Sequence, residues 1–404
     1  MSAPAASPFL LTVSGQDGPG IAARVFGALA RHGVRVEDVE QVRVHGRLLL
    51  CVEMALEPAA TGALVAALRE AFAGTGVEVA AGPLRESEVG DDGERHLITV
   101  LAPVIDAGVL EGVAGCVASS GGNIERIVRL SAYPVHSYEL VVAGADLERL
   151  RRELAAEAAR DEVDIAVQAS GLHRRAKHLI VMDADSTLVQ GEVIDLLAER
   201  QGCGAEVAAL TAAAMAGELD FEDALRARVR LLAGLDETDL VAVREAIVLA
   251  PGARTLVRTL KRVGYELAVV SGGFTQVIAP IVRDLGIDHL AANELVLQSG
   301  TLTGALRGPL VDRAGKADAL VRFAQTAGVP LARTIAVGDG ANDIDMLSVA
   351  GLGIAFNAKP VVREVADTSL SVPYLDAILF LLGISRADVE LADRMERQAE
   401  AVAR

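Results

Sequence analysis

Three largely apolar runs in the second half of the chain each end abruptly in polar residues. They are residues 178–182 before Asp183, residues 266–270 before Ser271, and residues 334–337 before Gly338 and Asp339. An apolar run without alternation is typical of a central strand in a parallel sheet that is covered on both faces. Because such sheets bind ligands beyond the carboxyl ends of their strands, the polar residues predict a site at that edge. We therefore expect an α/β fold with a doubly wound, Rossmann-like parallel sheet.

The segment between the first two runs follows a helical pattern. From about residue 189 to residue 251 it is rich in Ala, Leu and Glu, and its apolar residues recur with helical periodicity. It is too long for an ordinary connection. We expect it to form a helical cap over the site.

The first 170 residues alternate between short strands and helices in a pattern that occurs twice. Residues 8–13 and 96–100 predict opening strands, and each is followed by a glycine-containing turn and a helix. Two strands of alternating polarity, a second helix and a short strand complete each half. The halves form a weak repeat of about 88 residues, with Gly33 aligned to Gly121. This order, βαββαβ, predicts two ferredoxin-like domains.

Polar stretches separate these parts of the chain. Residues 82–94 are polar and charged, and residues 171–177 form a short basic connector. We therefore predict ferredoxin-like domains at residues 8–83 and 95–170, and the doubly wound domain with its cap at residues 177–404. A chain of 404 residues is long enough for three domains with separate cores.

The amino-acid composition of the chain bears on its expected binding partners and on its expected location in the cell. The net charge is -17, Trp is absent and 3% of residues are aromatic, so we expect no nucleic-acid partner. No apolar stretch approaches the ~20 residues of a membrane span, and residues 374–384, which come nearest, predict a buried helix. No signal peptide is evident. Cys51, Cys116 and Cys203 lie one to a domain, which indicates reduced thiols and a cytoplasmic location.

Asp183 and Asp185 are the first candidates for chemistry. A helix N-cap made by Asp185 or Ser186 would explain one carboxylate but would leave the other beside a like charge. Ser271 precedes two glycines, which suits donation to phosphate oxygens, and Lys316 lies at the start of an apparent helix. Taken singly, such features are also common in turns and on surfaces. Their joint occurrence predicts a phosphoryl-transfer site.

The motifs at these strand ends resemble those of the haloacid dehalogenase superfamily of phosphohydrolases. The chain has D-A-D-S-T-L-V-Q-G-E from Asp183, S-G-G-F from Ser271 and G-D-G-A-N-D-I-D-M-L from Gly338, and more narrowly it resembles the phosphoserine phosphatases. The resemblance covers roughly residue 177 to the C-terminus. Ala184 and Gly191 depart from the residues that are frequent in the family, but neither departure removes a catalytic group.

The two aspartates of the first motif have different expected roles. A carboxylate nucleophile that forms an aspartyl-phosphate divides a slow hydrolysis into two easier steps, and Asp183 fits because it ends the strand. The resemblance makes Asp185 the general acid and base. Ser271, Gly272 and Lys316 would hold the phosphate oxygens.

The remaining acidic residues predict a metal site. Carboxylates without nearby His or Cys favour a hard cation, so we expect Mg²⁺. Asp183 and Asp339 would be its side-chain ligands, with the backbone carbonyl of Asp185 a third by resemblance. Asn342 and Asp343 would orient metal waters and Lys316, or alternatively would support the site from outside or cap a helix. The metal would let several acids sit together in ionised form.

The cap is where the substrate would be recognised. A phosphorylated amino acid carries a carboxylate and an ammonium group, so its pocket needs a cation and an anion. The resemblance assigns these to Arg228 and Glu192, with Met215 and Phe221 as apolar walls. Alternatively, Arg228 is a solvated helix charge, and the two apolar residues are simply cap core.

The first 170 residues contain no catalytic cluster, so binding or assembly is their expected role. Gly15 to Ile21, at the first strand–helix turn, resembles ACT domains, which bind amino acids and regulate metabolic enzymes. We expect L-serine as an effector near Asp17, Gly18 and Gly20. In the second half, which matches less well, the weaker candidates are Gly108 and Asn123. Alternatively, both halves are dimerisation modules.

Together these features predict a cytoplasmic, Mg²⁺-dependent phosphatase that hydrolyses O-phosphoserine in serine biosynthesis. We expect a homodimer or a higher homo-oligomer. An alternative within the class is a phosphatase for another small phosphate ester or for phosphoproteins. An alternative outside it is an amino-acid sensor with incidental phosphatase activity, but the intact set of Asp183, Asp185, Lys316 and Asp339 argues against a sensor.

Overall fold

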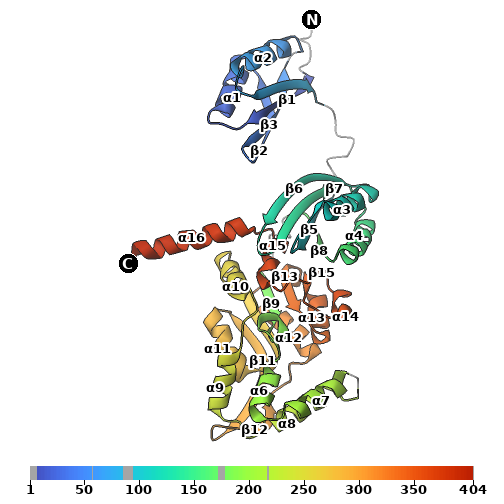
Figure 1. Ribbon diagram of the computed structural model, residues 1–404, viewed down its shortest axis with the longest axis vertical. Helices are drawn as coiled ribbons and strands as arrows, with labels where there is room; N and C mark the ends of the chain where they lie inside the picture. The colour runs from blue at the N-terminus through green and yellow to red at the C-terminus, as the bar shows by residue number, and fades with distance from the viewer. Residues whose placement is uncertain (1–6, 57, 85–93, 172–177, 216–217, 404) are drawn as a thin grey trace. The chain divides into compact units, whose positions relative to one another are not determined.

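The structure is a computed structural model that describes residues 7–56, 58–84, 94–171, 178–215 and 218–403 (Figure 1). The chain divides into two compact units, Met1–Glu88 and Val89–Arg404. The first unit is one ferredoxin-like domain. The second contains another such domain together with the doubly wound domain.

The first unit has the predicted order βαββαβ. Its elements are β1 (Ser7–Gln16), α1 (Ile21–Arg31), β2 (Arg35–Val44), β3 (Arg47–Leu56), α2 (Pro58–Ala71) and β4 (Val77–Pro83). The four strands form an antiparallel sheet in the order β2-β3-β1-β4. Alternate residues of the central strands, such as Leu11, Val13 and Leu50, are buried against the helix residues Val25 and Leu64.

The second ferredoxin-like domain repeats this arrangement. Its elements are β5 (Arg95–Ala102), α3 (Ala107–Ser119), β6 (Asn123–Ser131), β7 (His136–Ala143), α4 (Leu147–Asp161) and β8 (Asp164–Ala169). The strand order is β6-β7-β5-β8, equivalent to that of the first domain. The prediction of two ferredoxin-like domains is confirmed.

The third domain is built on a seven-stranded sheet. Its strands are β9 (Leu179–Asp183), β10 (Glu266–Phe274), β11 (His289–Gln298), β12 (Thr301–Arg307), β13 (Thr334–Gly338), β14 (Gly353–Phe356) and β15 (Thr368–Leu370). They lie in the order β12-β11-β10-β9-β13-β14-β15, and all are parallel except β12. Because the chain runs outward from β9 in both directions, a topological switch point lies beside β9. The doubly wound fold is confirmed.

Helices cover both faces of this sheet (Figure 1). Those flanking it include α10 (Ala253–Arg262), α11 (Thr275–Leu285), α12 (Arg313–Thr326) and α13 (Ile344–Val349). Ile180 and Met182 of β9 belong to one apolar cluster with α10 and α11, whereas Leu179 and Val181 belong to another with α12 and α13. An uninterrupted apolar strand is thus explained by burial on two sides.

The predicted cap forms four helices. They are α6 (Val193–Gln201), α7 (Gly204–Met215), α8 (Phe221–Leu231) and α9 (Glu237–Ala246). Two short chain segments connect the cap to the sheet and pair with each other through Val189 and Leu249. The N–H of Ala250 also donates to the carbonyl of Leu188 at 2.9 Å.

The C-terminal part adds short elements and one longer helix. These are α14 (Pro360–Arg363), α15 (Ile378–Leu381) and α16 (Arg386–Ala403). The predicted buried helix at residues 374–384 is realised as a 3₁₀ turn (Leu375–Ala377) followed by α15, and both are buried. No helix in the described part of the chain has both the length and the apolar character needed to cross a membrane. The cysteines at 51, 116 and 203 are free.

Candidate active site

Asp183 ends β9 beside the switch point of the sheet, and only 3% of it is exposed. Its Oδ1 accepts the N–H of Ala184 at 2.8 Å and lies 2.7 Å from Nζ of Lys316. Burial and the charge of Asp343 raise the pKa of Asp183 well above its ordinary value, and Lys316 opposes that rise. A further cation beside Asp183 would therefore favour the ionised form that a nucleophile requires.

Lys316 reaches this carboxylate from the first turn of α12, and it is almost fully buried. Its Nζ also donates to Oδ1 of Asp343 at 2.6 Å. Burial alone would lower the pKa of Lys316, but the charges of Asp183 and Asp343 raise it above the ordinary value. Lys316 is thus a fixed cation between two carboxylates.

Asp343 holds the turn after β13 as well as Lys316. Its Oδ2 accepts the N–H groups of Asp339 at 3.1 Å and of Gly340 at 3.0 Å. A side chain at Gly338 would overlap Asp343, so this turn requires glycine there. Both carboxylate oxygens of Asp343 are therefore occupied within the protein.

Asp185 lies in the irregular turn η1 (Ala184–Leu188) that follows β9. Its Oδ1 accepts the N–H of Val193 at 2.8 Å, and its Oδ2 accepts the hydroxyl of Ser271 at 3.1 Å. Burial raises the pKa of Asp185, although these hydrogen bonds and Lys316 lower it. A carboxyl group with a raised pKa suits a residue that first gives and then takes a proton.

The glycines after Ser271 allow a close approach at the end of β10. A Cβ on Gly273 would lie 2.9 Å from Oγ of Ser271 and 3.0 Å from Oδ2 of Asp185. The side-chain amide of Asn293, in β11, donates to the carbonyl of Gly272 at 2.8 Å. The Ser271 loop is thereby held against both neighbouring strands.

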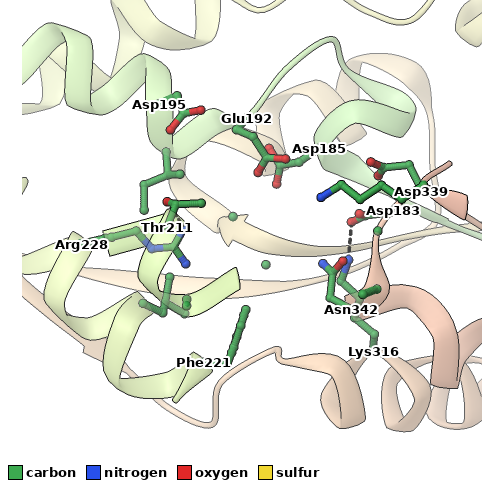
Figure 2. Close-up of a pocket in the computed structure, with 18 residues that line it drawn as sticks. Asp183, Asp185, Glu192, Asp195, Thr211, Phe221, Arg228, Lys316, Asp339 and Asn342 are labelled. Atoms are coloured by element: carbon green, nitrogen blue, oxygen red, sulfur yellow. Dashed lines mark hydrogen bonds and ion pairs between the residues drawn. The ribbon is translucent and has the colours of Figure 1, made fainter. Parts of the chain in front are cut away.

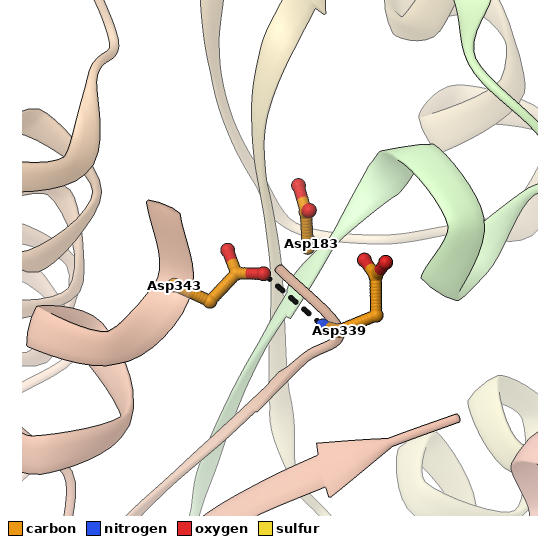
Figure 3. A group of neighbouring side chains, drawn as sticks. All are labelled: Asp183, Asp339 and Asp343. Atoms are coloured by element: carbon orange, nitrogen blue, oxygen red, sulfur yellow. Dashed lines mark hydrogen bonds between the residues drawn. The ribbon is translucent and has the colours of Figure 1, made fainter. Parts of the chain in front are cut away.

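Three carboxylates form a cluster that suits a metal ion (Figure 3). Oxygen atoms of Asp183, Asp339 and Asp343 all lie within 4.8 Å of one another. Burial and Asp343 raise the pKa of Asp339 to about 6, so a cation is needed to keep the group ionised at lower pH. Oxygen ligands of this kind fit Mg²⁺. Because Asp343 is engaged elsewhere, Asp183 and Asp339 are the freer ligands.

A pocket of about 470 Å³ joins these residues to the cap (Figure 2). Its cap side is lined by Glu192, which precedes α6, and by Phe221 and Arg228 of α8. Glu192 is exposed, but desolvation of its carboxyl group in the pocket raises its pKa to about 7, and the charges of Asp185 and Asp339 add to the rise. The pocket thus offers a guanidinium on one side and carboxylates on the other.

Comparisons with known proteins agree with this geometry. The model of the haloacid dehalogenase-like hydrolases matches residues 180–348, and two ACT-domain models match residues 7–81 and 94–168. A phosphoserine phosphatase of Streptomyces coelicolor is 51% identical over 393 residues, which cover 96% of this chain and 94% of that protein. The chain belongs to the phosphoserine phosphatase family.

Two further proteins are similar to this chain over most of its length. Phosphoserine phosphatase SerB2 of Mycobacterium tuberculosis is 50% identical over 96% of each chain. The crystal structure of a probable phosphoserine phosphatase from Vibrio cholerae, in unliganded form, superimposes with a TM-score of 0.58 at 33% identity. That comparison covers 73% of this chain and 88% of the other.

Most residues predicted from the phosphatase motifs lie together in the structure. Those that line the pocket are Asp183, Asp185, Glu192, Phe221, Arg228, Gly272, Lys316, Asp339 and Asn342. Ser271 is fully buried beneath it and contacts Asp185. Met215 ends α7, and its side chain lies outside the described part of the structure.

Sequence reasoning did not single out four residues that contribute to this site. Asp195, Thr211 and Lys359 line the pocket, and Asn293 anchors Gly272 from below. Asp195 and Thr211 lie on the cap helices α6 and α7, and a helical period of apolar residues says nothing about which polar side chains face the sheet. Asn293 is a polar residue at a position where the alternating strand β11 turns its side chains inward, and it is 1% exposed. A polar residue at such a position needs a hydrogen-bond partner, and this is the signal in the sequence that could have drawn attention to it.

The residues predicted for an effector differ between the two ACT domains. In the first, a pocket of about 230 Å³ is lined by Asp17, Gly18 and Arg24, and the N-cap Gly20 leaves α1 without a side-chain cap. Asp17 also pairs with Arg43 at 2.7 Å.

In the second ACT domain the corresponding helix start is already satisfied. The carboxylate of Asp106 accepts the N–H groups of Gly108 at 2.9 Å and of Val109 at 3.1 Å. Asn123 is exposed at the start of β6. The start of α3 is therefore capped by a side chain, whereas that of α1 is not.

Proposed function

We propose that this chain hydrolyses O-phospho-L-serine to L-serine and inorganic phosphate, the step that yields serine in its biosynthesis. The observation that carries the proposal is the Asp183–Lys316 pair, buried at the switch point and open to a pocket with both a guanidinium and a carboxylate. The membership of the phosphoserine phosphatase family supports the same substrate. Within this proposal the domains span residues 8–83, 95–170 and 177–404.

Asp183 and Asp339 would hold Mg²⁺, with the backbone carbonyl of Asp185 as a third ligand. Their clustered oxygens and the rise in the pKa of both aspartates support a bound cation. When bound, Mg²⁺ would neutralise charge on the phosphoryl oxygens and keep the nucleophile ionised. Asp343 would act indirectly, because it holds Lys316 and the turn that carries Asp339.

The reaction proceeds in two displacements. A carboxylate oxygen of Asp183 attacks phosphorus, and the bond from phosphorus to the serine oxygen breaks while Asp185 gives that oxygen a proton. Water then attacks phosphorus, Asp185 takes the water proton, the bond from phosphorus to the Asp183 oxygen breaks, and phosphate leaves. Lys316 and the N–H of Gly272 stabilise the phosphoryl oxygens in both steps, and the hydroxyl of Ser271, which donates to Asp185 in this structure, would turn to join them.

The cap selects the amino-acid part of the substrate. Arg228 binds the α-carboxylate, and Glu192 binds the α-ammonium group. Phe221 and Met215 would form apolar walls. A partly buried guanidinium and a carboxylate of raised pKa both gain from an ion of opposite charge, which supports this assignment.

The test is a panel of phosphate esters, assayed with and without Mg²⁺, on the full chain and on Asp183→Asn. We expect phosphoserine to give the highest kcat/KM, a requirement for Mg²⁺, and nearly complete loss of turnover in Asp183→Asn. Asp318→Asn, which removes an exposed charge from α12, is the control and should keep full activity. Substantial turnover by folded Asp183→Asn would refute the covalent route.

The panel also separates the remaining alternatives. A higher kcat/KM for another small ester would identify a different substrate, and activity on a phosphoprotein comparable to that on phosphoserine would show that the cap opens to macromolecules. No turnover of any ester by the Mg²⁺-loaded chain would leave amino-acid sensing as its role.

We further propose that L-serine binds the first ACT domain near Asp17, Gly18 and Gly20 and lowers activity. The uncapped start of α1 and the adjacent pocket support a site for an amino-acid carboxylate there. In the second ACT domain Gly108 and Asn123 would form a weaker site, since Asp106 already occupies the helix start. Such coupling requires that serine prefers one arrangement of the chain.

Gly18→Leu tests this regulation in the full chain. Its Cβ would meet no atom within 4 Å, so the fold should tolerate the change while the pocket is filled. We expect weaker serine inhibition than in Gly62→Leu, a control on α2 with equally open space. Inhibition that is purely competitive, and equal in both variants, would assign serine to the catalytic pocket instead.

Location and assembly complete the proposal. Three free cysteines support a cytoplasmic setting. The edge strand β2, exposed along all ten residues, supports association between copies of the chain as a homodimer or larger homo-oligomer.

A further inference from the structure

Arg228 is held in the cap by neutral groups only. Its Nε donates to the carbonyl of Ala224 at 3.4 Å, and its Nη1 donates to Oγ1 of Thr211 at 3.3 Å. Among the residues that the structure describes, no carboxylate forms an ion pair with this guanidinium. Burial lowers the pKa of Arg228, and the charges of Glu192 and Asp195 raise it from a distance. The guanidinium is thus a partly desolvated cation whose hydrogen bonds in the described part of the chain are with neutral groups.

Thr211 is fixed in a way that suits it to receive Arg228. Its hydroxyl donates to the carbonyl of Val207, one turn earlier in α7, at 3.0 Å. With the proton directed there, the oxygen lone pairs are left for the N–H of Arg228, which arrives from α8. Figure 2 shows the two side chains side by side at the wall of the pocket, which both residues line.

We propose that Thr211 is a positioning residue that orients Arg228 toward the α-carboxylate of the substrate. The inference rests on the proposed function, because it needs a substrate with that carboxylate. Nη1 and Nε are each engaged by the protein, so the guanidinium plane is fixed from two sides. The N–H groups that remain are those that can meet a carboxylate in the pocket.

The cost of losing this contact follows from the geometry. An arginine side chain has several soft torsions, and fixing them on binding opposes affinity. Without the Thr211 oxygen, one N–H of a partly buried guanidinium would lack an acceptor, and the group would turn to find one. Binding of a carboxylate would then have to restore the productive orientation. The loss should therefore appear in KM for carboxylate-bearing substrates.

Thr211→Val keeps the shape of the side chain and removes the acceptor, and Thr211→Ser keeps the hydroxyl and removes the methyl group. The substrates are O-phosphoserine and O-phosphoethanolamine, which has the phosphate and the ammonium group but no carboxylate. For Thr211→Val we expect kcat/KM for phosphoserine to fall roughly tenfold more than for phosphoethanolamine, mainly through KM. Thr211→Ser should restore most of the difference.

A double-mutant cycle with Arg228→Ala decides whether Thr211 acts through Arg228. If it does, Thr211→Val adds no further loss on phosphoserine once Arg228 is absent. A loss of the same size in both backgrounds would overturn the proposal, because Thr211 would then act independently. Equal losses on both substrates, or failure of Thr211→Ser to restore activity, would also overturn it in favour of a packing role.

These measurements distinguish a failure of the proposed role of Thr211 from a failure of the proposed substrate. If the unaltered chain does not prefer phosphoserine to phosphoethanolamine, then the substrate assignment itself fails. If it does prefer phosphoserine, and Thr211→Val leaves that preference unchanged, only the role of Thr211 fails. Thermal unfolding of each variant, compared with the unaltered chain, excludes loss of fold as the cause.

Discussion

Glu192 shows how a single residue can be tuned by its neighbours. Its carboxylate lines the same pocket as Asp185 and Asp339, and desolvation together with the charges of Asp185, Asp339 and Asp195 raises its pKa to about 7. Glu192 is therefore protonated at a higher pH than an ordinary glutamate. If Glu192 binds the ammonium group of the substrate as proposed, the ionised form is the one that binds, and binding is then linked to deprotonation of Glu192.

The direction of this coupling between proton binding and substrate binding predicts how KM depends on pH. Below its pKa Glu192 must lose a proton before it can pair with the ammonium group, so KM for phosphoserine should rise as pH falls. Mg²⁺ held by Asp339 as proposed would counter the negative charge, so in the loaded enzyme the rise should begin below pH 7 and above the ordinary value of 4.5. KM measured against pH at saturating Mg²⁺ is the check.

Glu192→Gln is the matched variant for that measurement. It cannot ionise, so its KM should be higher at pH 8 and should lack the step that belongs to Glu192. The phosphate of the substrate titrates near pH 6 in both enzymes and cancels in the comparison. Parallel pH profiles for the two enzymes would show that Glu192 does not pair with the ammonium group.

At the residue scale, the sequence predicted those site residues that belong to a motif. It did not predict those that come to the site only when the chain folds. Asp183 and Lys316 could be predicted because each follows a recognisable local pattern at a strand end or a helix start. Thr211 carries no such pattern, and Asn293 stands out in the sequence only as a polar residue within an alternating strand. Their importance arises only when α7 meets α8 and when β11 lies beside β10.

Among the elements, α10 shows how the cap is joined to the sheet. The chain returns from the cap through Leu249 and enters α10 at Gly252. The carbonyl of Pro251 accepts the N–H of Leu375 at 2.8 Å, and Gly252 packs directly against Asp376. The segment through which the chain returns from the cap is therefore held by Leu375 and Asp376, which lie far along the sequence.

Glycines at the two ends of α10 make a matched pair for a test of this contact. Gly252 and Gly264 have positive φ of 81° and 85°, so alanine at either should cost about 1–2 kcal/mol of unfolding free energy. A Cβ at Gly252 would also overlap Asp376, whereas at Gly264 it would meet nothing within 4 Å. We expect Gly252→Ala to lose about 1–3 kcal/mol more in urea unfolding. Equal losses would mean that Asp376 moves aside without cost.

The order of the elements was predictable because each kind of burial leaves its own period in the sequence. Strand β9 is apolar up to Asp183 because helices cover both faces, and the two segments that connect the cap to the sheet pair through Val189 and Leu249. The turn η1 was not predictable in this way. Ser186 adopts a positive φ of 57° there, which the later contacts of Asp185 hold in position rather than any local preference.

At the scale of the whole molecule, the second ACT domain shares an apolar core with the phosphatase domain, which the internal repeat did not predict. Leu101 and Ala166 of this domain belong to the same apolar core as Leu379 and Leu381 of the phosphatase. The side-chain amide of Gln168 also donates to the carbonyl of Leu381 at 2.9 Å. An alternating strand pattern predicts one buried face, so the burial of the second face could not be foreseen from it.

The buried carboxylate of Asp164 takes part in this contact between the second ACT domain and the phosphatase domain. Oδ2 of Asp164, at the start of β8, accepts the N–H of Ser371 at 2.7 Å. Burial raises the pKa of Asp164, and the hydrogen bonds from Ser371 oppose the rise. Its contribution to stability is therefore complete below the ordinary pKa of 3.8, and part is lost as pH rises through the raised value.

Two substitutions at Asp164 separate the hydrogen bond from the charge. Asp164→Ala leaves the N–H of Ser371 without its acceptor and should destabilise the chain by about 1–3 kcal/mol in urea unfolding at pH 7. Asp164→Asn keeps an acceptor and is always neutral, so it should be at least as stable as the unaltered chain at that pH. Because the charge is absent in Asp164→Asn, its lead over the unaltered chain should shrink as pH falls toward 4. If Asn and Ala destabilise equally, the apolar core alone holds the ACT domain to the phosphatase, and the bond from Ser371 contributes nothing measurable.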